Sequence, residues 1–463
     1  MTQVQDITSP MTGMERRATF SLAGIYALRM LGLFMILPVL SLFAEQLQGS
    51  TPLLIGLAIS VYGLSQAILQ IPFGLLSDRF GRKKIIVCGL LLFAAGSIVA
   101  AMATTIYGVL LGRALQGSGA IAAAIMALVA DLTQEVHRTK AMALIGVSIG
   151  LSFGVAITLG PVIAGFAGVQ GIFWLTALLA LLAILVLLLL VPTPKKSRLH
   201  RDAEVVPGQF SDVLKNADLL RLDFGILVLH LILTASFVII PLLLRDAGLL
   251  SARHWQVYLP VMVVAMLMIV PFIILAEKKQ KMKAVFLGAI AVLVLANIGF
   301  IRFHDSVIGI GACLGLFFCG FNLLEATLPS LISKTAPSDL RGTAMGVYSS
   351  CQFLGAFLGG AVGGWLYGAH GVASVFLFSA GAALLWLLVA LFMRPPRNLA
   401  NLLISMESIA ADRVDDFVDA LLAVEGVVEV KAHSEEQVAY LKVDNRKLEK
   451  AALQQLISQW SAA

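Results

Sequence analysis

Long apolar segments separated by short polar turns recur along most of the chain. Each is about 20 residues long, the length that an α-helix needs to cross the hydrocarbon core of a bilayer. Twelve segments fit this description: 20–44, 53–76, 84–103, 106–130, 141–165, 171–191, 222–244, 255–276, 284–301, 306–332, 343–367 and 372–393. The pattern therefore predicts an all-α polytopic membrane protein with twelve transmembrane helices.

A charged segment at 192–221 divides these helices into two halves of six, at 1–191 and 222–397. Its stretch FSDVLKNADLLRLDF is amphipathic, which predicts a cytoplasmic linker helix along the membrane surface. When the first half is shifted by 203 residues, Arg138 falls on Arg341 and Gly160 on Gly363. A duplicated six-helix unit is typical of transporters whose substrate site lies between the two units.

The pattern changes after Arg397. Alternation and amphipathicity predict a strand in NLLISM, a helix in DRVDDFVDALLAV, a hairpin in GVVEVKA and QVAYLKV, and a helix in NRKLEKAALQQLISQW. The order βαββα predicts a small ferredoxin-like α+β domain at 398–463 that lacks its last strand. This tail has a net charge of −5, whereas the rest of the chain has +11.

Composition and charge agree with a membrane location. Hydrophobic residues make up 59% of the chain and charged residues 13%. Lys and Arg are concentrated in alternate turns, 22 of them against three in the other turns. Because cytoplasmic loops carry the basic excess, we expect both termini and the C-terminal domain in the cytoplasm. No cleavage site follows the first apolar run, so no removable signal peptide is predicted.

The turn between the second and third helices contains the dense charge cluster GLLSDRFGRKK. It matches the G-x-x-x-D-R-x-G-R-K/R signature of the major facilitator superfamily, which the chain therefore resembles. The matching residues are Gly74, Asp78, Arg79, Gly81, Arg82 and Lys83. LGRALQGSGA in helix four resembles the R-x-x-Q-G motif of this family through Arg113, Gln116 and Gly117.

A glycine-rich helix five, with Gly160, Pro161 and Gly165, resembles the drug-efflux branch of the family. Stretches in both halves and the acidic tail are similar to a bacterial group of this branch that carries a C-terminal soluble domain. The resemblance implies a multi-pass protein of the bacterial inner membrane that performs proton-coupled efflux.

The charge cluster is interpreted as a conformational switch. A helix N-terminus stabilises an anion, and helix eleven begins near Gly342 on the side of Asp78. Contact between them would latch the two halves when the cytoplasmic side is closed, with Arg82 and Asp131 completing a charge chain. The alternative is that these charges only set the topology.

Ionisable side chains deep in the helices are Arg29, Arg113, His230 and Glu325. Such groups are costly in a membrane and usually face the interior of the bundle. Amides able to line a substrate cavity with Arg29 are Gln66, Gln70, Gln116, Asn322 and Gln352. If the four ionisable groups share this cavity, its charge is neutral to positive, which leaves anionic, neutral and zwitterionic cargo open.

Glu325 is the carboxylate identified well inside a helix, and it is the candidate for proton coupling together with His230 and Arg113. A carboxyl group at this depth can hold a proton in one conformation and release it in another. The alternative is a static pair of Glu325 with His230 or an arginine that holds helices together.

No HExxH, GxSxG, P-loop or paired-carboxylate site is found, so no enzyme activity is predicted. The four cysteines lie inside apolar segments and are interpreted as packing residues. No metal site, cofactor or nucleic-acid partner is expected, and the expected partners of a monomer are a small-molecule substrate, protons and the bilayer. Alternatives to efflux are proton-coupled uptake and a transporter-like sensor that signals through the tail.

Overall fold

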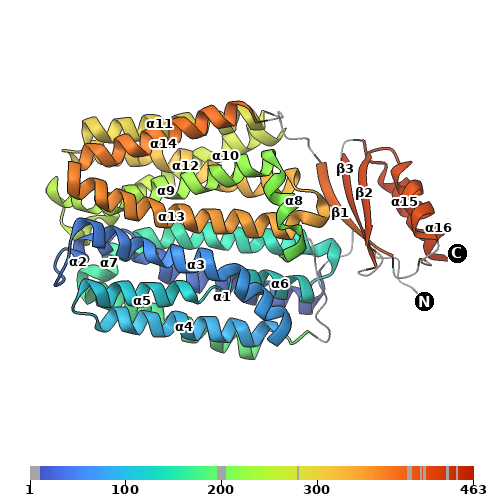
Figure 1. Cartoon of the computed structure of the whole chain (residues 1–463), viewed down its shortest axis with the longest axis horizontal. Coiled ribbons are helices and arrows are strands. Elements are labelled where there is room, and N and C mark those ends of the chain that lie inside the picture. Colours follow the sequence, from blue (N-terminus) through green and yellow to red (C-terminus); the bar gives the residue numbers. More distant parts are fainter. Residues whose placement is uncertain are drawn as a thin grey trace.

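In the computed structural model, a long helical bundle carries a small α+β domain at one end (Figure 1). The structure describes residues 11–194, 205–278, 281–393, 399–406, 409, 413–433, 437–444 and 447–462. We call the end of the bundle next to the small domain the tail side and the other end the opposite side. Lys195, Lys196, Arg198, Arg201, Lys279, Arg394 and Arg397, which contribute to the predicted charge bias, lie outside the described residues.

The first half begins with α1 (Gly13–Met35) and α2 (Leu40–Ala44), followed by α3 (Pro52–Phe80) and α4 (Arg82–Met102). The expected helix at 20–44 ends at the same residue as α2, but its start is wrong and it is interrupted. It starts earlier, because Thr12 and Glu15 form a capping box that satisfies the first free N–H groups. It breaks before α2, because Pro38 lacks an N–H and disfavours helical geometry at the preceding residue.

The expected helix at 106–130 is also divided, into α5 (Ile106–Ser118) and α6 (Ala122–Leu132). Gly119 lies at the break, packed so closely on α4 that an added Cβ would be 2.3 Å from the Gly89 carbonyl oxygen. Only glycine permits this approach, and the break frees backbone groups inside the bundle for other partners.

The expected helices at 141–165 and 171–191 form one element, α7 (Glu135–Leu190), with no separate loop. Gly168 divides it with φ +67°, a conformation that residues with a side chain rarely adopt. The two legs therefore reverse direction at one glycine.

The second half contains α9 (Ala217–Asp246), α10 (Trp255–Lys278), α11 (Met282–Phe303), α12 (Val307–Thr335), α13 (Arg341–His370) and α14 (Val372–Leu391). Short 3₁₀ turns lie at Pro207–Gln209, Ser251–Arg253 and Ser338–Leu340. The expected linker helix is divided: α8 (Phe210–Lys215) ends before Asn216, whose side chain caps α9. The rest of that amphipathic stretch, residues 217–224, forms the first two turns of α9.

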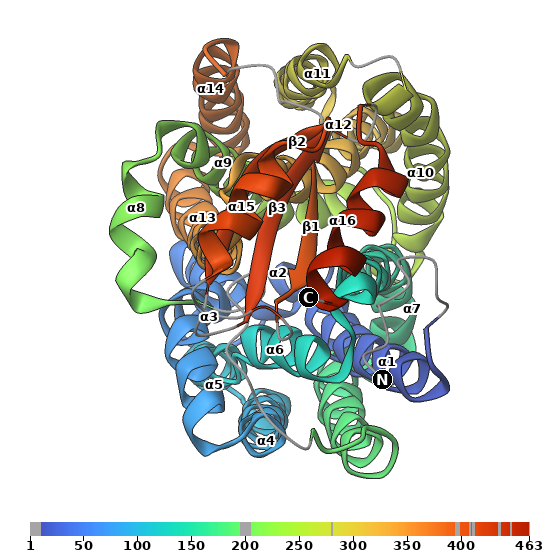
Figure 2. The ribbon, with the colours of Figure 1, turned by 90° about the vertical axis from the view of Figure 1, so that its right-hand side faces the viewer.

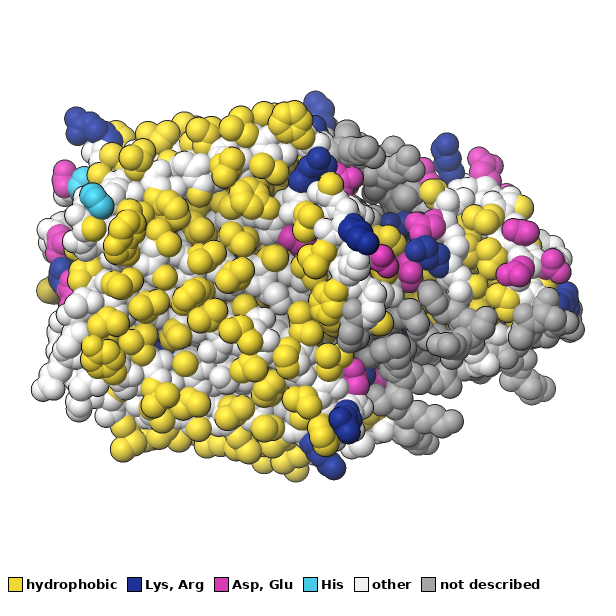
Figure 3. Space-filling model, viewed as in Figure 1, with side chains coloured by type: hydrophobic (Ala, Val, Ile, Leu, Met, Phe, Trp, Pro, Cys, Tyr) yellow, Lys and Arg dark blue, Asp and Glu magenta, His cyan; other side chains and the backbone are white. Residues whose placement is uncertain are grey.

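Eleven helices in the described part of the chain are long and apolar enough to cross a membrane, counting α5–α6 as one span and α7 as one. Apolar side chains cover the visible flank of the bundle, while Lys, Arg, Asp and Glu gather at its two ends (Figure 3). This surface matches a bilayer with a polar interface on each side. The prediction of an all-α polytopic membrane fold is confirmed.

A seam of glycines joins the two halves between α3 and α13. An added Cβ on Gly56 would lie 2.1 Å from the Gly360 carbonyl oxygen, and one on Gly364 would lie 2.5 Å from that of Pro52. Nearer the middle, a Cβ on Gly63 would lie 2.6 Å from the Phe353 carbonyl oxygen. The helices are antiparallel, and this backbone-to-backbone contact runs from the opposite side to the centre of the bundle.

The tail contains β1 (Leu399–Ser405), α15 (Val414–Leu422), β2 (Val427–His433), β3 (Val438–Asp444) and α16 (Lys450–Ala462). The sheet order is β1-β3-β2, and both pairs are antiparallel. Phe417, Leu441 and Leu453 belong to a separate hydrophobic core under the two helices. The predicted order of strands and helices is confirmed, although α16 starts at Lys450 rather than at Asn445.

The sheet of the tail lies across the end of the bundle (Figure 2). Lys431 Nζ is 2.9 Å from Asp339 Oδ1, and Lys442 Nζ donates to the Lys334 carbonyl oxygen at 3.2 Å. Burial lowers the pKa of Lys442. β1 also contacts α7 of the first half and α12 of the second, so the tail touches both halves.

The seam generates the first prediction. Gly56→Ala should lower the melting temperature of the purified protein, because the new methyl group overpacks a contact that has no side chain to move; overpacking costs about 1–3 kcal/mol. Gly288→Ala in α11 is the matched control, since nothing lies within 4 Å of its added Cβ. Equal melting temperatures for the two variants would show that the seam tolerates separation.

Candidate transport pathway

The charge cluster between α3 and α4 forms a compact network at the tail side. Arg82 is ion-paired with Asp78, and its Nε donates to Asp131 Oδ2 at 3.2 Å. Arg82 also donates to Ser77 Oγ at 3.0 Å. The Asp131 side chain is fully buried and that of Asp78 one-third exposed. The predicted chain of charges is therefore present, built on Arg82.

The predicted latch is not formed in this conformation. Within the described residues, the recorded partner of Asp78 is Arg82, and no hydrogen bond joins Asp78 to the start of α13. Gly74 packs only near Ala123, and Gly81, which has φ +98°, closes α3. Arg79 lies over the Phe80 ring. The latch was predicted for the state closed on the tail side, so it stays a prediction.

Arg29 is completely buried in the first half. Its Nη2 lies 2.8 Å from Gln66 Oε1 and 2.9 Å from both the Tyr62 hydroxyl and the Gly119 carbonyl oxygen. That carbonyl is available because the chain breaks between α5 and α6. Gln66 then donates to Gln70 at 3.3 Å. Neutral oxygens, rather than a carboxylate, hold this guanidinium.

Arg113 is held in the same way. It donates to the Ala58 and Ile59 carbonyl oxygens of α3 at 3.3 and 3.1 Å, and to Gln116 Oε1 at 2.8 Å. Gln116 in turn donates to Ser97 Oγ at 2.7 Å. These bonds tie α5 to α3 and α4, and they give a partner to both polar atoms of the buried Gln116 amide.

The second half contains a polar cluster around Glu325, which we call the Glu325 cluster. Gln352 Nε2 lies 2.8 Å from His230 Nε2 and 3.3 Å from Glu325 Oε1, while His230 is 3.8 Å from Glu325 Oε2. Three helices, α9, α12 and α13, supply these side chains. Glu325 is 36% exposed although it is deep within α12, so it borders open space inside the bundle. Asn322, one turn earlier, has a buried Nδ2 without a hydrogen-bond partner.

The condition that the four ionisable groups share one cavity is not met in this conformation, because Arg29 is 0% exposed and Arg113 3% exposed. Arg29 and Arg113 are bonded within the first half, and the Glu325 cluster lies in the second. The expected alternative of a Glu325–arginine pair is wrong, because both arginines bond to neutral oxygens. A sequence cannot show which way a helix is rotated, and this rotation separates the groups. Tyr62 and Phe353, with ring centroids 6.2 Å apart, lie between the two clusters.

Sequence reasoning also missed a second deep carboxylate. Asp223 in α9 is 2% exposed, and neither of its oxygens has a hydrogen-bond partner. It was overlooked because the predicted helix began at residue 222, which placed Asp223 at the membrane surface. The true start at Ala217 puts it more than one turn inside the helix.

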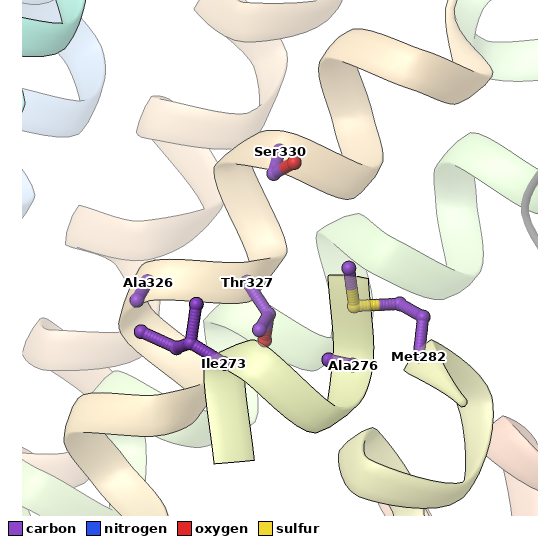
Figure 4. Close-up of a pocket in the computed structure, with 6 residues that line it drawn as sticks. All are labelled: Ile273, Ala276, Met282, Ala326, Thr327 and Ser330. Atoms are coloured by element: carbon purple, nitrogen blue, oxygen red, sulfur yellow. The ribbon is translucent and has the colours of Figure 1, made fainter. Parts of the chain in front are cut away.

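A small cavity of about 40 Å³ lies between α10, α11 and α12. Its lining residues are Ile273, Ala276, Met282, Ala326, Thr327 and Ser330 (Figure 4). Known ligand pockets for drug-sized molecules have volumes of roughly 300–1,000 Å³, so this cavity is large enough only for water.

An ion pair joins the halves on the opposite side. Arg245 at the end of α9 pairs with Glu45 after α2, and with its neighbour Asp246 at 2.9 Å. Glu45 and Arg245 are 200 residues apart in sequence, and both are partly exposed. Together with the glycine seam, this pair joins the two halves on the opposite side of the bundle.

A helical bundle in two halves, with ionisable groups held in its interior, has the architecture of a secondary transporter. The chain belongs to the Major Facilitator Superfamily, whose family model matches residues 22–360 and 331–414. It is therefore a transporter of this family and not an enzyme, and the resemblance predicted from the motifs is confirmed.

Over 454 residues the chain is 49% identical to the inner membrane transport protein YajR of Escherichia coli, covering 97% of this chain and 99% of that protein. It is 37% identical to an uncharacterized transporter of Buchnera aphidicola over 75% of this chain and 90% of that protein. A bacterial homolog of the human lysosomal transporter Spinster, in an inward-facing and occupied conformation, superposes with a TM-score of 0.63 at 14% identity. It covers 82% of this chain and 95% of that one, and shows the fold alone.

The ion pair on the opposite side generates the second prediction. Arg245→Glu should place two acids against Glu45 and open that side more often, raising the labelling rate of a cysteine introduced at Ser60 in the seam. Partly exposed pairs contribute about 0.2–1 kcal/mol, so the expected change is at most about fivefold. The measurement is reaction with a membrane-impermeant maleimide in a background without the native cysteines.

The double variant Glu45→Arg with Arg245→Glu should restore the original rate, because the pair is re-formed with reversed polarity. Arg253→Glu, an exposed change on the same side, is the control. If the double variant labels as fast as Arg245→Glu, the pair does not hold the halves together.

Proposed function

We propose that the protein is a proton-coupled exporter of small molecules that works by alternating access through twelve transmembrane helices, the legs of α7 counted separately. Glu325 with His230 and Gln352 would carry the coupled proton. The observation behind this proposal is a carboxyl group deep in α12, beside an imidazole and open interior space, with no arginine to keep it ionised.

The positions of the contacts between the halves support alternating access. The glycine seam and the Glu45–Arg245 pair lie on the opposite side, while the Asp78 latch is open on the tail side. This combination is expected of a conformation that opens toward the tail. Closing the tail side would engage Asp78 with α13, and the seam would then have to separate.

The basic excess of the tail-side turns supports a cytoplasmic location for that side in the bacterial inner membrane, with the tail as a cytoplasmic ferredoxin-like domain. One relative is named for drug resistance, a function that fits export: over 140 residues the chain is 36% identical to multidrug resistance protein 2 of Bacillus subtilis, covering 29% of this chain and 34% of that protein. Arg29 and Arg113 are buried and bonded within the first half, so they do not select the charge of the substrate.

The decisive experiment uses proteoliposomes with a pH-sensitive dye inside and an imposed proton gradient. A panel of organic anions, zwitterions, neutral metabolites and organic cations is added in turn. We expect at least one class to move protons in the wild-type protein. Transport of no class in either direction would instead favour a transporter-like sensor, and uptake against export is decided by the direction of movement.

Glu325→Gln is the third prediction. This variant mimics the protonated acid, so proton-driven transport should be lost while exchange of the solute across the membrane is retained. A static Glu325–His230 pair predicts the reverse: a lower melting temperature with proton-driven transport intact. Asp305→Asn, at an exposed carboxylate on the opposite side, is the control.

The fourth prediction concerns the latch. Asp78→Asn should slow transport without reducing membrane insertion, since the neutral side chain binds more weakly to the N-terminus of α13. A cysteine introduced at Asn322 should then react faster from the tail side. Lys84→Gln, an exposed change in the same turn, should alter neither property. Unchanged transport and labelling in Asp78→Asn would leave only a topological role for the cluster.

A further inference from the structure

We propose that Asp223 is a second proton-binding group, placed between Glu325 and the tail side of the bundle. The second half would then contain two carboxyl groups in sequence, rather than one, along the route by which protons leave. This inference rests on the proposed proton coupling and adds a residue to it.

The packing of α9 on α13 fixes the place of Asp223. Added Cβ atoms on Gly355 and Gly359 would each lie 2.1 Å from a carbonyl oxygen of α9, those of Leu227 and Leu231. The two helices are therefore parallel, with a constant offset of 128 residues. The same offset places Asp223 beside Cys351 on α13, one turn from Gly355.

The order along the bundle follows from helix geometry. Asp223 is six residues from the tail-side start of α9 and Tyr348 seven from that of α13, so both lie about 10 Å inside at 1.5 Å per residue. Glu325 is ten residues from the tail-side end of α12, about 15 Å inside. Asp223 therefore lies between Glu325 and the tail side.

Tyr348 connects the two carboxyl groups. It is 3% exposed and interacts electrostatically with both Glu325 and Asp223. Its hydroxyl has no hydrogen-bond partner, like both oxygens of Asp223 and Oε2 of Glu325. If the helices shift so that both carboxyl groups come within hydrogen-bond distance of this hydroxyl, it can accept a proton from the Glu325 carboxyl as it donates its own to the Asp223 carboxylate, and it is then left unchanged.

The surroundings of Asp223 suit a group that gains and loses a proton. The ionisable groups recorded near it are Tyr348 and Cys351 on α13, with Glu325 on α12 beyond Tyr348. Asp218 and Arg221 on its own helix pair with each other at 2.6 Å. An ionised carboxylate without a partner is strongly unfavourable in such a place, and a bound proton removes this penalty. Access of water to Asp223 during the transport cycle would allow its release.

The test needs no substrate. Infrared difference spectra between acidic and alkaline buffers, recorded on the whole protein in lipid, show the C=O stretching band of each buried carboxyl group that loses its proton. We expect two bands in the wild-type protein. Asp223→Asn should lack one, Glu325→Gln should lack the other, and Asp218→Asn, the control on the same helix, should keep both.

An unchanged spectrum in a folded Asp223→Asn protein would overturn the inference. If this variant has a lowered melting temperature, Asp223→Glu replaces it, and a shifted band assigns the signal while an unshifted one overturns it. The two proposals fail differently: proton-driven transport that persists in Glu325→Gln refutes the coupling role of Glu325, whereas the Asp223 band tests proton binding alone.

Discussion

The rest of the structure depends on how ionisable groups are accommodated in an apolar interior. The two halves solve this problem in opposite ways. The first half holds two guanidinium groups with backbone and amide oxygens, some of which are available only because α5 and α6 are separated at Gly119. The second half holds two carboxyl groups with few partners. The two guanidinium groups keep their charge and are each held by several hydrogen bonds, although Nε and Nη1 of Arg29 have no partner, whereas a carboxyl group with few partners changes its protonation with its surroundings.

This difference suggests different roles for the two halves: one is held rigid, and the other changes the surroundings of an acid. In the first half, the arginine networks tie α1, α3, α4 and α5 into a unit that would move as one body. In the second half, α9, α12 and α13 bring Glu325, His230 and Gln352 together, so a small shift between these helices changes the environment of the acid. The seam links the two halves through α13. This helix carries the seam glycines Gly360 and Gly364 and, about two turns before Gly360, the Glu325 partner Gln352.

The sequence predicted what depends on local pattern. Apolar length located the membrane helices, and alternation located the strands of the tail, because burial imposes these periods directly. Pro38 marks a helix break that a reader of the sequence could have found. Gly119 gives no such sign, since its role comes from contact with Gly89, 30 residues away.

The interior was harder to predict for a related reason. Arg29 and Glu325 were both placed correctly inside helices, yet their partners depend on helix rotation, which hydropathy does not encode when all faces are apolar. Asp223 was lost to an error of five residues in a helix start. In a membrane protein such an error places at the aqueous interface a carboxylate that lies inside the bilayer, and a candidate proton-binding group is then read as an ordinary surface residue.

The helical hairpin of α7 has a consequence for how the chain enters the membrane. From Ala141 to Leu190 the sequence contains no Asp, Glu, Lys or Arg, and its two legs are joined at Gly168 without a polar loop. The hairpin contains no charged residue that would oppose its insertion into the membrane or fix which side its ends occupy. The basic residues that flank it, Arg138 and Lys140 before it and Lys195 and Lys196 after it, retain both ends on one side. During synthesis the two legs should therefore insert together, as a single folded pair.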